Sequence, residues 1–253
     1  MKTSGNTILI TGGATGIGLA MAESFLKSGN EVIICGRRRG KLNAARKRLP
    51  GLHVRVCDVS AEKDRKSLFA WVSRNFREIN IIINNAGIQR PIDLSRGVAD
   101  LNKKSNKPEI DINLTAPIYL SALFIPHLAK RKEAAIINIS SGLAFVPLAI
   151  VPVYCATKAG LHSYTVSLRH QLSKTGRRVF EIIPPMVDTE LDGGSRDGRA
   201  ERYRGIRPEE VASAAIDGIG RDVYEIAIGM AEGLRAGSRS DPDGAFARMN
   251  GGR

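Results

Sequence analysis

The sequence contains little cysteine, and its cysteines follow no pattern. Only Cys35, Cys57 and Cys155 occur among the 253 residues. An odd number without paired spacing argues against a disulfide framework, and none of the three has the spacing of metal ligands. Cys35 and Cys57 lie in apolar runs, so both are expected to be buried thiols.

The sequence also lacks an apolar run long enough to span a bilayer. Its first residues, Met1-Lys2-Thr3-Ser4-Gly5, lead straight into a strand-like segment without the pattern of a signal peptide. Together with the unpaired cysteines, these absences predict a cytoplasmic protein in a reducing compartment, with no insertion into a membrane.

Acidic residues are scarce relative to basic ones. There are 25 Asp and Glu against 38 Lys and Arg, which gives a net charge of +13, and no acidic residue interrupts eight basic ones between positions 32 and 57. Such an excess indicates a polyanionic or phosphorylated partner, or simply a solvated basic surface. No helix-turn-helix, RRM or zinc-finger pattern accompanies it, so we expect no nucleic-acid binding.

Strand-like and helix-like segments alternate along the chain. Continuous apolar strands separated by amphipathic helices indicate a parallel sheet covered on both faces. The predicted fold is α/β: a single-domain, doubly wound parallel sheet of the Rossmann type over residues 1–229, with ligands bound beyond the carboxyl ends of the strands. Residues 230–253 show little periodicity and are expected to be a C-terminal tail that could be flexible. The predicted strands are 7–11, 31–35, 53–57, 79–83, 134–139, 179–183 and 223–228, and the helices 17–27, 41–49, 61–76, 110–130, 153–172 and 208–219.

A glycine-rich turn follows the first predicted strand, in Thr11-Gly12-Gly13-Ala14-Thr15-Gly16-Ile17-Gly18. A tight turn needs residues without a Cβ, and phosphates need close approach to backbone N–H groups at the start of a helix. The turn therefore predicts a dinucleotide site, although a strand–helix turn can need glycine for its shape alone.

The end of the second predicted strand indicates which dinucleotide would bind. An acidic residue there would bond a ribose 2′-hydroxyl, but this sequence has Gly36 followed by Arg37, Arg38 and Arg39. A forked guanidinium can clasp a 2′-phosphate. We therefore expect NADP(H) to be preferred, with NAD(H) also possible.

A second group of residues carries acid–base chemistry. Ser140-Ser141 follows a predicted strand, and Tyr154 and Lys158 stand four apart on a predicted helix, hence on one face. An ammonium beside a phenol lowers the phenol pKa from about 10 toward working pH, so that the phenol can exchange a proton with a carbonyl or alcohol oxygen. Taken alone, the pair could be surface packing and the serine a turn or cap.

These motifs together resemble the short-chain dehydrogenase/reductase family. The glycine turn matches the family's TGxxxGIG motif, Asn84-Asn85-Ala86-Gly87 its NNAG motif, and Ser141…Tyr154-x-x-x-Lys158 its catalytic signature. The runs 154–158 and 184–189 look most like the DltE-type members. The resemblance implies hydride transfer between NAD(P)(H) and an alcohol or carbonyl compound.

The resemblance also assigns roles to individual residues. It implies Asn113 as a fourth catalytic residue in a proton relay, and Ser141 in preference to Ser140. Pro185 stands where the family has glycine, which leaves the conformation of that loop open. The implied catalytic residues are Asn113, Ser141, Tyr154 and Lys158; the implied cofactor-binding residues are Gly12, Ala14, Thr15, Gly16, Ile17, Gly18, Arg37, Arg38, Asp58, Val59, Asn85, Ala86, Gly87, Tyr154, Lys158, Pro184, Val187 and Thr189.

Two segments are expected to border the substrate. Residues 143–153 are apolar and residues 190–205 are rich in arginine, which suggests an apolar carbonyl compound with an anionic group; a solvated lid is the alternative. The resemblance further implies a homodimer or homotetramer joined through helices 110–130 and 153–172. Two other readings remain: a cofactor-binding regulator with this fold but without chemistry and, less favoured, a nucleic-acid-binding protein.

Overall fold

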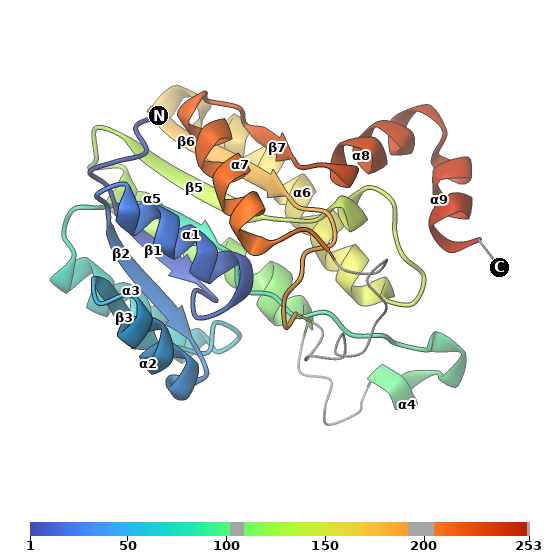
Figure 1. Ribbon diagram of the computed structural model, residues 1–253, viewed down its shortest axis with the longest axis horizontal. Coiled ribbons are helices and arrows are strands. Elements are labelled where there is room, and N and C mark those ends of the chain that lie inside the picture. Colours follow the sequence, from blue (N-terminus) through green and yellow to red (C-terminus); the bar gives the residue numbers. More distant parts are fainter. Residues whose placement is uncertain (102–108, 192–204, 252–253) are drawn as a thin grey trace.

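A seven-stranded parallel sheet forms the centre of the molecule in the computed structural model, which describes residues 1–101, 109–191 and 205–251 (Figure 1). The strand order is β3-β2-β1-β4-β5-β6-β7. Chain order reverses between β1 and β4, and the predicted doubly wound fold is therefore confirmed. The strands are β1 (Thr7–Thr11), β2 (Glu31–Gly36), β3 (Leu52–Val56), β4 (Ile79–Asn84), β5 (Ala134–Ile139), β6 (Arg177–Ile183) and β7 (Glu225–Ala227).

Helices cover both faces of this sheet (Figure 1). In β1, Ile8 and Ile10 enter the core beneath α1, α2 and α7, whereas Leu9 enters the core beneath α3, α5 and α6. Successive strand side chains point to opposite faces, so an apolar run of this kind fills two cores at once. These helices are α1 (Gly16–Lys27), α2 (Arg39–Arg48), α3 (Glu62–Asn75), α5 (Ala116–Leu128), α6 (Pro152–Leu172) and α7 (Pro208–Gly220).

The described residues contain shorter elements as well. The segment expected as one helix over 110–130 begins with a π-helical turn, η2 (Asp111–Thr115), before α5. Such turns occur frequently at functional sites. The other short elements are α4 (Val98–Leu101) and the 3₁₀ turns η1 (Leu94–Arg96), η3 (Gly142–Ala144) and η4 (Ser173–Thr175).

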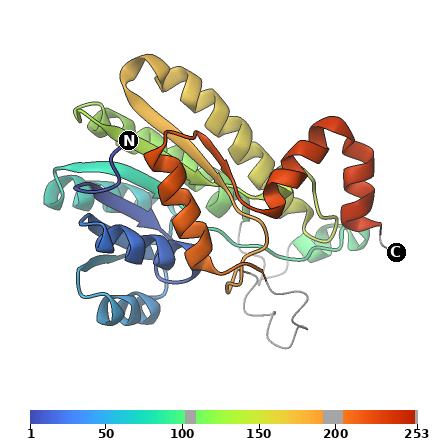
Figure 2. The same cartoon turned by 45° about the horizontal axis from the view of Figure 1, so that its top comes forward.

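The C-terminal segment was expected to be a tail, because its sequence shows little periodicity. In the structure it forms two helices, α8 (Met230–Ser240) and α9 (Pro242–Asn250). Both lie beyond β7 (Figures 1 and 2). Ala231 of α8 is fully buried, so a short apolar contact anchors a helix that is otherwise rich in Gly, Ser and Arg. No helix in the described ranges has the length and apolar character needed to cross a membrane.

Candidate active site

The glycine turn between β1 and α1 brings three parts of the chain into close approach. Gly12 and Gly16 have φ of +64° and +54°, a region that favours glycine. A Cβ on Gly12 would lie 2.8 Å from the Cα of Ala86, and one on Gly16 would lie 2.9 Å from Cγ2 of Thr189. The predicted residues of the glycine turn, of the end of β4 and of the loop after β6 thus lie together.

Thr11 and Asn85 fasten the glycine turn to β4. The hydroxyl of Thr11 accepts hydrogen bonds from the backbone N–H groups of Asn85 and Ala86, each at 3.0 Å. In return, Nδ2 of Asn85 donates to the carbonyls of Thr11 and Gly12 at 2.9 and 3.2 Å. These four bonds fix the edge of the sheet at which the chain order reverses.

The start of α1 suits the phosphates of a dinucleotide. Thr15 at the N-cap makes no side-chain capping bond, and the first turn contains no acidic residue. The first-turn amides, with the positive end of the helix dipole, can therefore receive an anion. Ala14, Thr15 and Ile17 are all partly exposed there. The residues present thus fit a nicotinamide dinucleotide.

Arg38 and Lys41 share one carboxylate at the edge of this turn. Glu190 accepts from Nη1 of Arg38 at 3.1 Å and from Nζ of Lys41 at 2.9 Å, while Nη2 of Arg38 lies 3.3 Å from Oγ1 of Thr15. These cations hold the pKa of Glu190 below its usual value. Arg37 is exposed beside them. The pairing of Lys41 with Glu190 could not be predicted, since nothing in the sequence connects residues so far apart.

Asp58 and Val59 follow β3 and take part in local structure. The carboxylate of Asp58 accepts from the backbone N and the hydroxyl of Ser60 at 3.1 and 2.7 Å. The side chain of Val59 is buried, and its carbonyl accepts from Nη1 of Arg65 at 2.7 Å. One oxygen of Asp58 therefore shapes the turn, whatever else the residue contacts.

Tyr154 and Lys158 lie on one face of α6, as their spacing predicts. Nζ of Lys158 donates to the carbonyl of Ile139 at 2.8 Å and lies 5.6 Å from the centroid of the Tyr154 ring. Both side chains are buried. Burial lowers the pKa of Lys158 to about 8, and the negative charge of Glu181 opposes that shift. The amine is thus held in place, and its pKa lies close to the pH at which enzymes commonly work.

Asn113 lies in the π-helical turn and is fully buried. Its Oδ1 accepts from the backbone N of Ile88 at 2.9 Å, and its Nδ2 donates to the carbonyl of Ile88 at 2.8 Å. A Cβ on Gly87 would lie 3.5 Å from Oδ1 of Asn113 and 3.8 Å from Nζ of Lys158. Gly87, Asn113 and Lys158 are therefore neighbours, and Asn113 fixes the chain after the NNAG motif.

Ser141 follows β5 and is the N-cap of η3. Its Oγ accepts from the backbone N of Leu143 at 3.1 Å. Ser141 is therefore a helix cap, as the sequence allowed, and this does not conflict with a second role for its hydroxyl. Ser140 is directed back to β6, with its backbone N 2.9 Å from the carbonyl of Ile182. Leu143 packs with Tyr154, which places η3 against the start of α6.

The loop after β6 is held by backbone bonds to its neighbours. The carbonyl of Pro184 accepts from the N of Gly142 at 3.0 Å, and Met186 and Asp188 bond Ile206, each at 3.0 Å. Val187 is buried between them. A loop with proline in place of glycine thus still reaches both η3 and Gly16. The arginines at 196, 199, 202 and 204 lie outside the described residues.

The C-terminal helices α8 and α9 pack beside η3, a contact that could not be seen in the sequence. A Cβ on Gly142 would lie 2.8 Å from Cδ1 of Leu234 in α8. Asn250 at the end of α9 donates to the carbonyl of Pro147 at 2.9 Å and accepts from the N of Ala149 at 2.7 Å. The tail therefore holds the apolar segment that was expected to border the substrate.

Comparisons with known proteins give a consistent picture. Residues 6–200 match the family model described as short chain dehydrogenase. The oxidoreductase DltE of Bacillus subtilis is 48% identical over 99% of this chain and 98% of its own, and serine 3-dehydrogenase of Rhizobium radiobacter is 35% identical over 80% and 82%. A short chain dehydrogenase from Burkholderia cenocepacia, solved with NADP, superposes with a TM-score of 0.82 at 25% identity, over 98% of this chain and 99% of its own.

Proposed function

The chain belongs to the short-chain dehydrogenase family and is one of its oxidoreductases, and from that premise we propose that it transfers hydride between NADP(H) and an alcohol–carbonyl pair, with Tyr154 as general acid and base. A carbonyl compound and its alcohol are the proposed substrates. The predicted resemblance to this family and its DltE-type members is thereby confirmed.

One observation carries the proposal. The ammonium of Lys158 is buried, tethered to the carbonyl of Ile139, and faces the ring of Tyr154 at 5.6 Å. A buried cation costs free energy unless it serves a partner, and a phenolate is the partner that it stabilises here. This pair lies at the carboxyl end of the sheet, next to Gly87 and hence to the glycine turn.

The proposed reduction divides the work among three side chains. A nicotinamide dinucleotide held at the glycine turn would supply the hydride for the carbonyl carbon. Tyr154 donates its phenolic proton to the carbonyl oxygen as negative charge grows there, and the hydroxyl of Ser141 donates a hydrogen bond to the same oxygen. The Lys158 ammonium stabilises the phenolate that remains. Oxidation of the alcohol runs through the same groups in reverse.

The phenolate must then regain its proton. Lys158 lies on the same helix face, with its Nζ 5.6 Å from the ring centroid of Tyr154, and its lowered pKa of about 8 allows the ammonium to release a proton near neutral pH. Asn113 borders the same space at Gly87, which supports the proposed route from the lysine toward solvent along the π-helical turn.

The preference for NADP(H) is part of the proposal. Arg38 and Lys41 lie together at the edge of the glycine turn, and Arg38 contacts Thr15. The two cations, together with the absence of an acidic residue at the end of β2 in the sequence, support binding of a 2′-phosphate in place of the Glu190 carboxylate. The ratio of kcat/KM for NADPH to that for NADH tests this, and equal use of NADH would contradict it.

The proposed substrate class is an apolar carbonyl compound that carries an anionic group. Leu143 and Leu148 pack against the cluster that contains Val151, Tyr154 and Cys155, which supports an apolar contact surface. The name of the relative serine 3-dehydrogenase describes a substrate with a carboxylate, which supports including hydroxy and keto acids in a screen. Faster turnover of every neutral ketone than of every acid would contradict this class.

Consumption of NADPH with a panel of aldehydes, ketones and keto acids tests the function. Tyr154→Phe removes the proton donor while keeping the ring, so kcat is expected to fall by about 10²- to 10⁴-fold with little change in NADPH binding. Unchanged turnover in Tyr154→Phe would overturn the proposed role, and a wild type that binds NADPH without any turnover would favour a regulator.

A further inference from the structure

A row of polar residues crosses the sheet beneath α6. Asn84 of β4 is in register with Asn138 of β5, Asn138 with Glu181 of β6, and Glu181 with Glu225 of β7. Residues in register on neighbouring strands point to the same face. Two amides and two carboxylates thus lie side by side in the part of the sheet that should be apolar.

The side of α6 that faces this row is polar as well. Tyr154, Lys158 and His162 follow one another at intervals of four residues, so they form a stripe along one helix face. The stripe continues with Thr165, which accepts from Nδ2 of Asn138 at 2.9 Å. The catalytic pair is therefore one end of a buried polar seam between α6 and the sheet.

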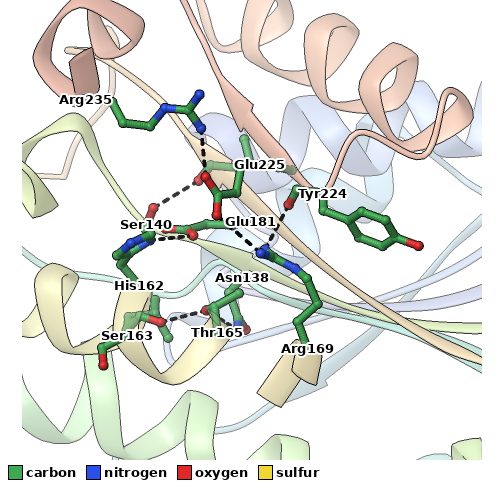
Figure 3. A network of polar contacts seen from close by, with 12 residues as sticks. Asn138, Ser140, His162, Ser163, Thr165, Arg169, Glu181, Tyr224, Glu225 and Arg235 are labelled. Atoms are coloured by element: carbon green, nitrogen blue, oxygen red, sulfur yellow. Dashed lines mark hydrogen bonds and ion pairs between the residues drawn. The ribbon is translucent and has the colours of Figure 1, made fainter. Parts of the chain in front are cut away.

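Glu181 occupies the centre of this seam. Its side chain is fully buried, and its Oε2 lies 2.8 Å from Nδ1 of His162 (Figure 3). Its other oxygen, Oε1, is buried without a hydrogen-bond partner among the described residues. A carboxylate in the core with one unsatisfied oxygen is costly, which indicates that its charge has a use.

The other charged groups around Glu181 are already paired. Arg169 of α6 and Arg235 of α8 bind the two oxygens of Glu225 at 3.2 and 2.8 Å (Figure 3). Glu225 of β7 therefore binds both arginines, while Glu181 pairs with His162. Lys158 precedes His162 by one turn of α6, and its Nζ bonds the carbonyl of Ile139, which is in register with Ile182, the residue after Glu181. The ammonium and the carboxylate therefore lie in the same part of the seam. His162 is half-buried and its ring packs edge-on against Phe145 at 4.7 Å.

We propose that Glu181 is a positioning residue of the active site: its buried carboxylate, held by His162, keeps the Lys158 ammonium charged beside Tyr154. The inference rests on the proposed function, because it assigns a purpose to that charge, but the effect on Lys158 can be measured without turnover. The side chain of Glu181 is fully buried in the core, so its expected effect is through the lysine and not through contact with substrate or cofactor.

The direction of the effect follows from the charges. Burial lowers the pKa of Lys158 to about 8, and Glu181 raises it. Without the carboxylate, the ammonium would lose its proton at lower pH. The phenolate of Tyr154 would then lack its cation in the upper part of the working pH range.

A titration of the Lys158 side chain tests this directly. In protein labelled with ¹³C-lysine, the Cε resonance of Lys158, identified by its loss in Lys158→Met, reports the charge of the amine. We expect a midpoint near pH 8 in the wild type and a fall of about one unit in Glu181→Gln, the size expected for loss of a nearby opposite charge. Glu225→Gln, the same substitution one strand away, should leave the midpoint unchanged.

A second variant tests the same proposal if Glu181→Gln does not fold. Glu181→Met combined with His162→Phe removes the carboxylate without leaving an unpaired ion in the core, and should lower the midpoint by a similar amount. A folded Glu181→Gln or double variant with the wild-type midpoint would overturn the inference, as would an equal fall in Glu225→Gln.

Turnover separates this inference from the proposed function. If the wild type reduces carbonyl compounds, the alkaline limb of kcat should move to lower pH in Glu181→Gln and stay in place in Glu225→Gln. If the wild type shows no turnover but the Lys158 midpoint falls as expected, the proposed function fails and the role of Glu181 stands.

Discussion

At the scale of single residues, Glu190 pairs with the two cations that we propose to bind a 2′-phosphate. Its two oxygens bind Arg38 and Lys41, and all three side chains are about half exposed. Exposed ion pairs contribute only about 0–1 kcal/mol, so a phosphate with more negative charge can displace the carboxylate. If NADPH binds as proposed, Glu190 would therefore be a weak competitor for its 2′-phosphate.

Removal of this competitor should strengthen NADPH binding. In Glu190→Gln, the Kd for NADPH is expected to fall by about 2- to 5-fold. The reason is that Arg38 and Lys41 no longer have to release a carboxylate before they bind the 2′-phosphate. The Kd for NADH should not change, since its ribose carries no phosphate. Isothermal titration with both cofactors measures the two values.

Glu62→Gln is the matched control for this substitution. Glu62 pairs with Lys66 on the exposed face of α3, at 2.6 Å, and lies outside the predicted site. It should leave both dissociation constants unchanged. Equal tightening of NADPH and NADH in Glu190→Gln would show that Glu190 acts on something other than the 2′-phosphate.

At the scale of elements, α8 and α9 support the apolar segment beside η3. Asn250 of α9 makes two hydrogen bonds to the backbone at Pro147 and Ala149, which are the direct polar ties between α9 and that segment in the described residues. A net hydrogen bond contributes about 0.5–1.5 kcal/mol, so both together can decide whether the segment keeps its position.

Asn250→Ala should therefore affect the substrate more than the cofactor. We expect KM for the best carbonyl substrate to rise by about 3- to 10-fold, while the Kd for NADPH stays the same. Steady-state kinetics beside cofactor titration separate the two effects. Asn75→Ala, which removes an exposed amide bond to Trp71 within α3, provides the comparison, and an equal rise there would refute a local role.

The helices and strands also show which parts of the fold can be predicted from the sequence alone. Apolar periodicity predicted the strands and the main helices, because the central strands fill a core on both faces. It missed α8, whose anchor Ala231 stands among Gly, Ser and Arg, and it missed the π-helical turn that holds Asn113. The first depends on a tertiary contact and the second on hydrogen bonds to Ile88.

The same limit applies to the site. The motifs predicted Tyr154, Lys158 and the glycine turn, because helix and turn geometry fix such residues locally. Glu181 stands within the apolar run of β6, between Phe180 and Ile182, and its partner His162 is 19 residues away in the chain. A periodic pattern records which face a residue occupies but not which side chain it meets across that face.

At the scale of the whole molecule, the outer faces of α5 and α6 bear on the predicted homodimer or homotetramer. Tyr119 of α5 and Val166 of α6 are 54% and 42% exposed, although each belongs to a helix whose other face is in the core. Single exposed apolar side chains are common, but a self-complementary interface needs the same helices to meet their copies. These two positions are therefore the place to test association.

Val166→Glu should weaken association if the copies meet through α6, because a carboxylate would be buried at the interface without a partner. Light scattering after gel filtration should give a multiple of the 27.4 kDa chain for the wild type and a smaller mass for the variant. Val223→Glu places the same charge on an exposed valine, 38% accessible, that precedes β7 and lies off both helices. If that control dissociates the assembly and Val166→Glu does not, the copies meet through the β7 edge, because a new carboxylate disrupts only the surface on which it lies.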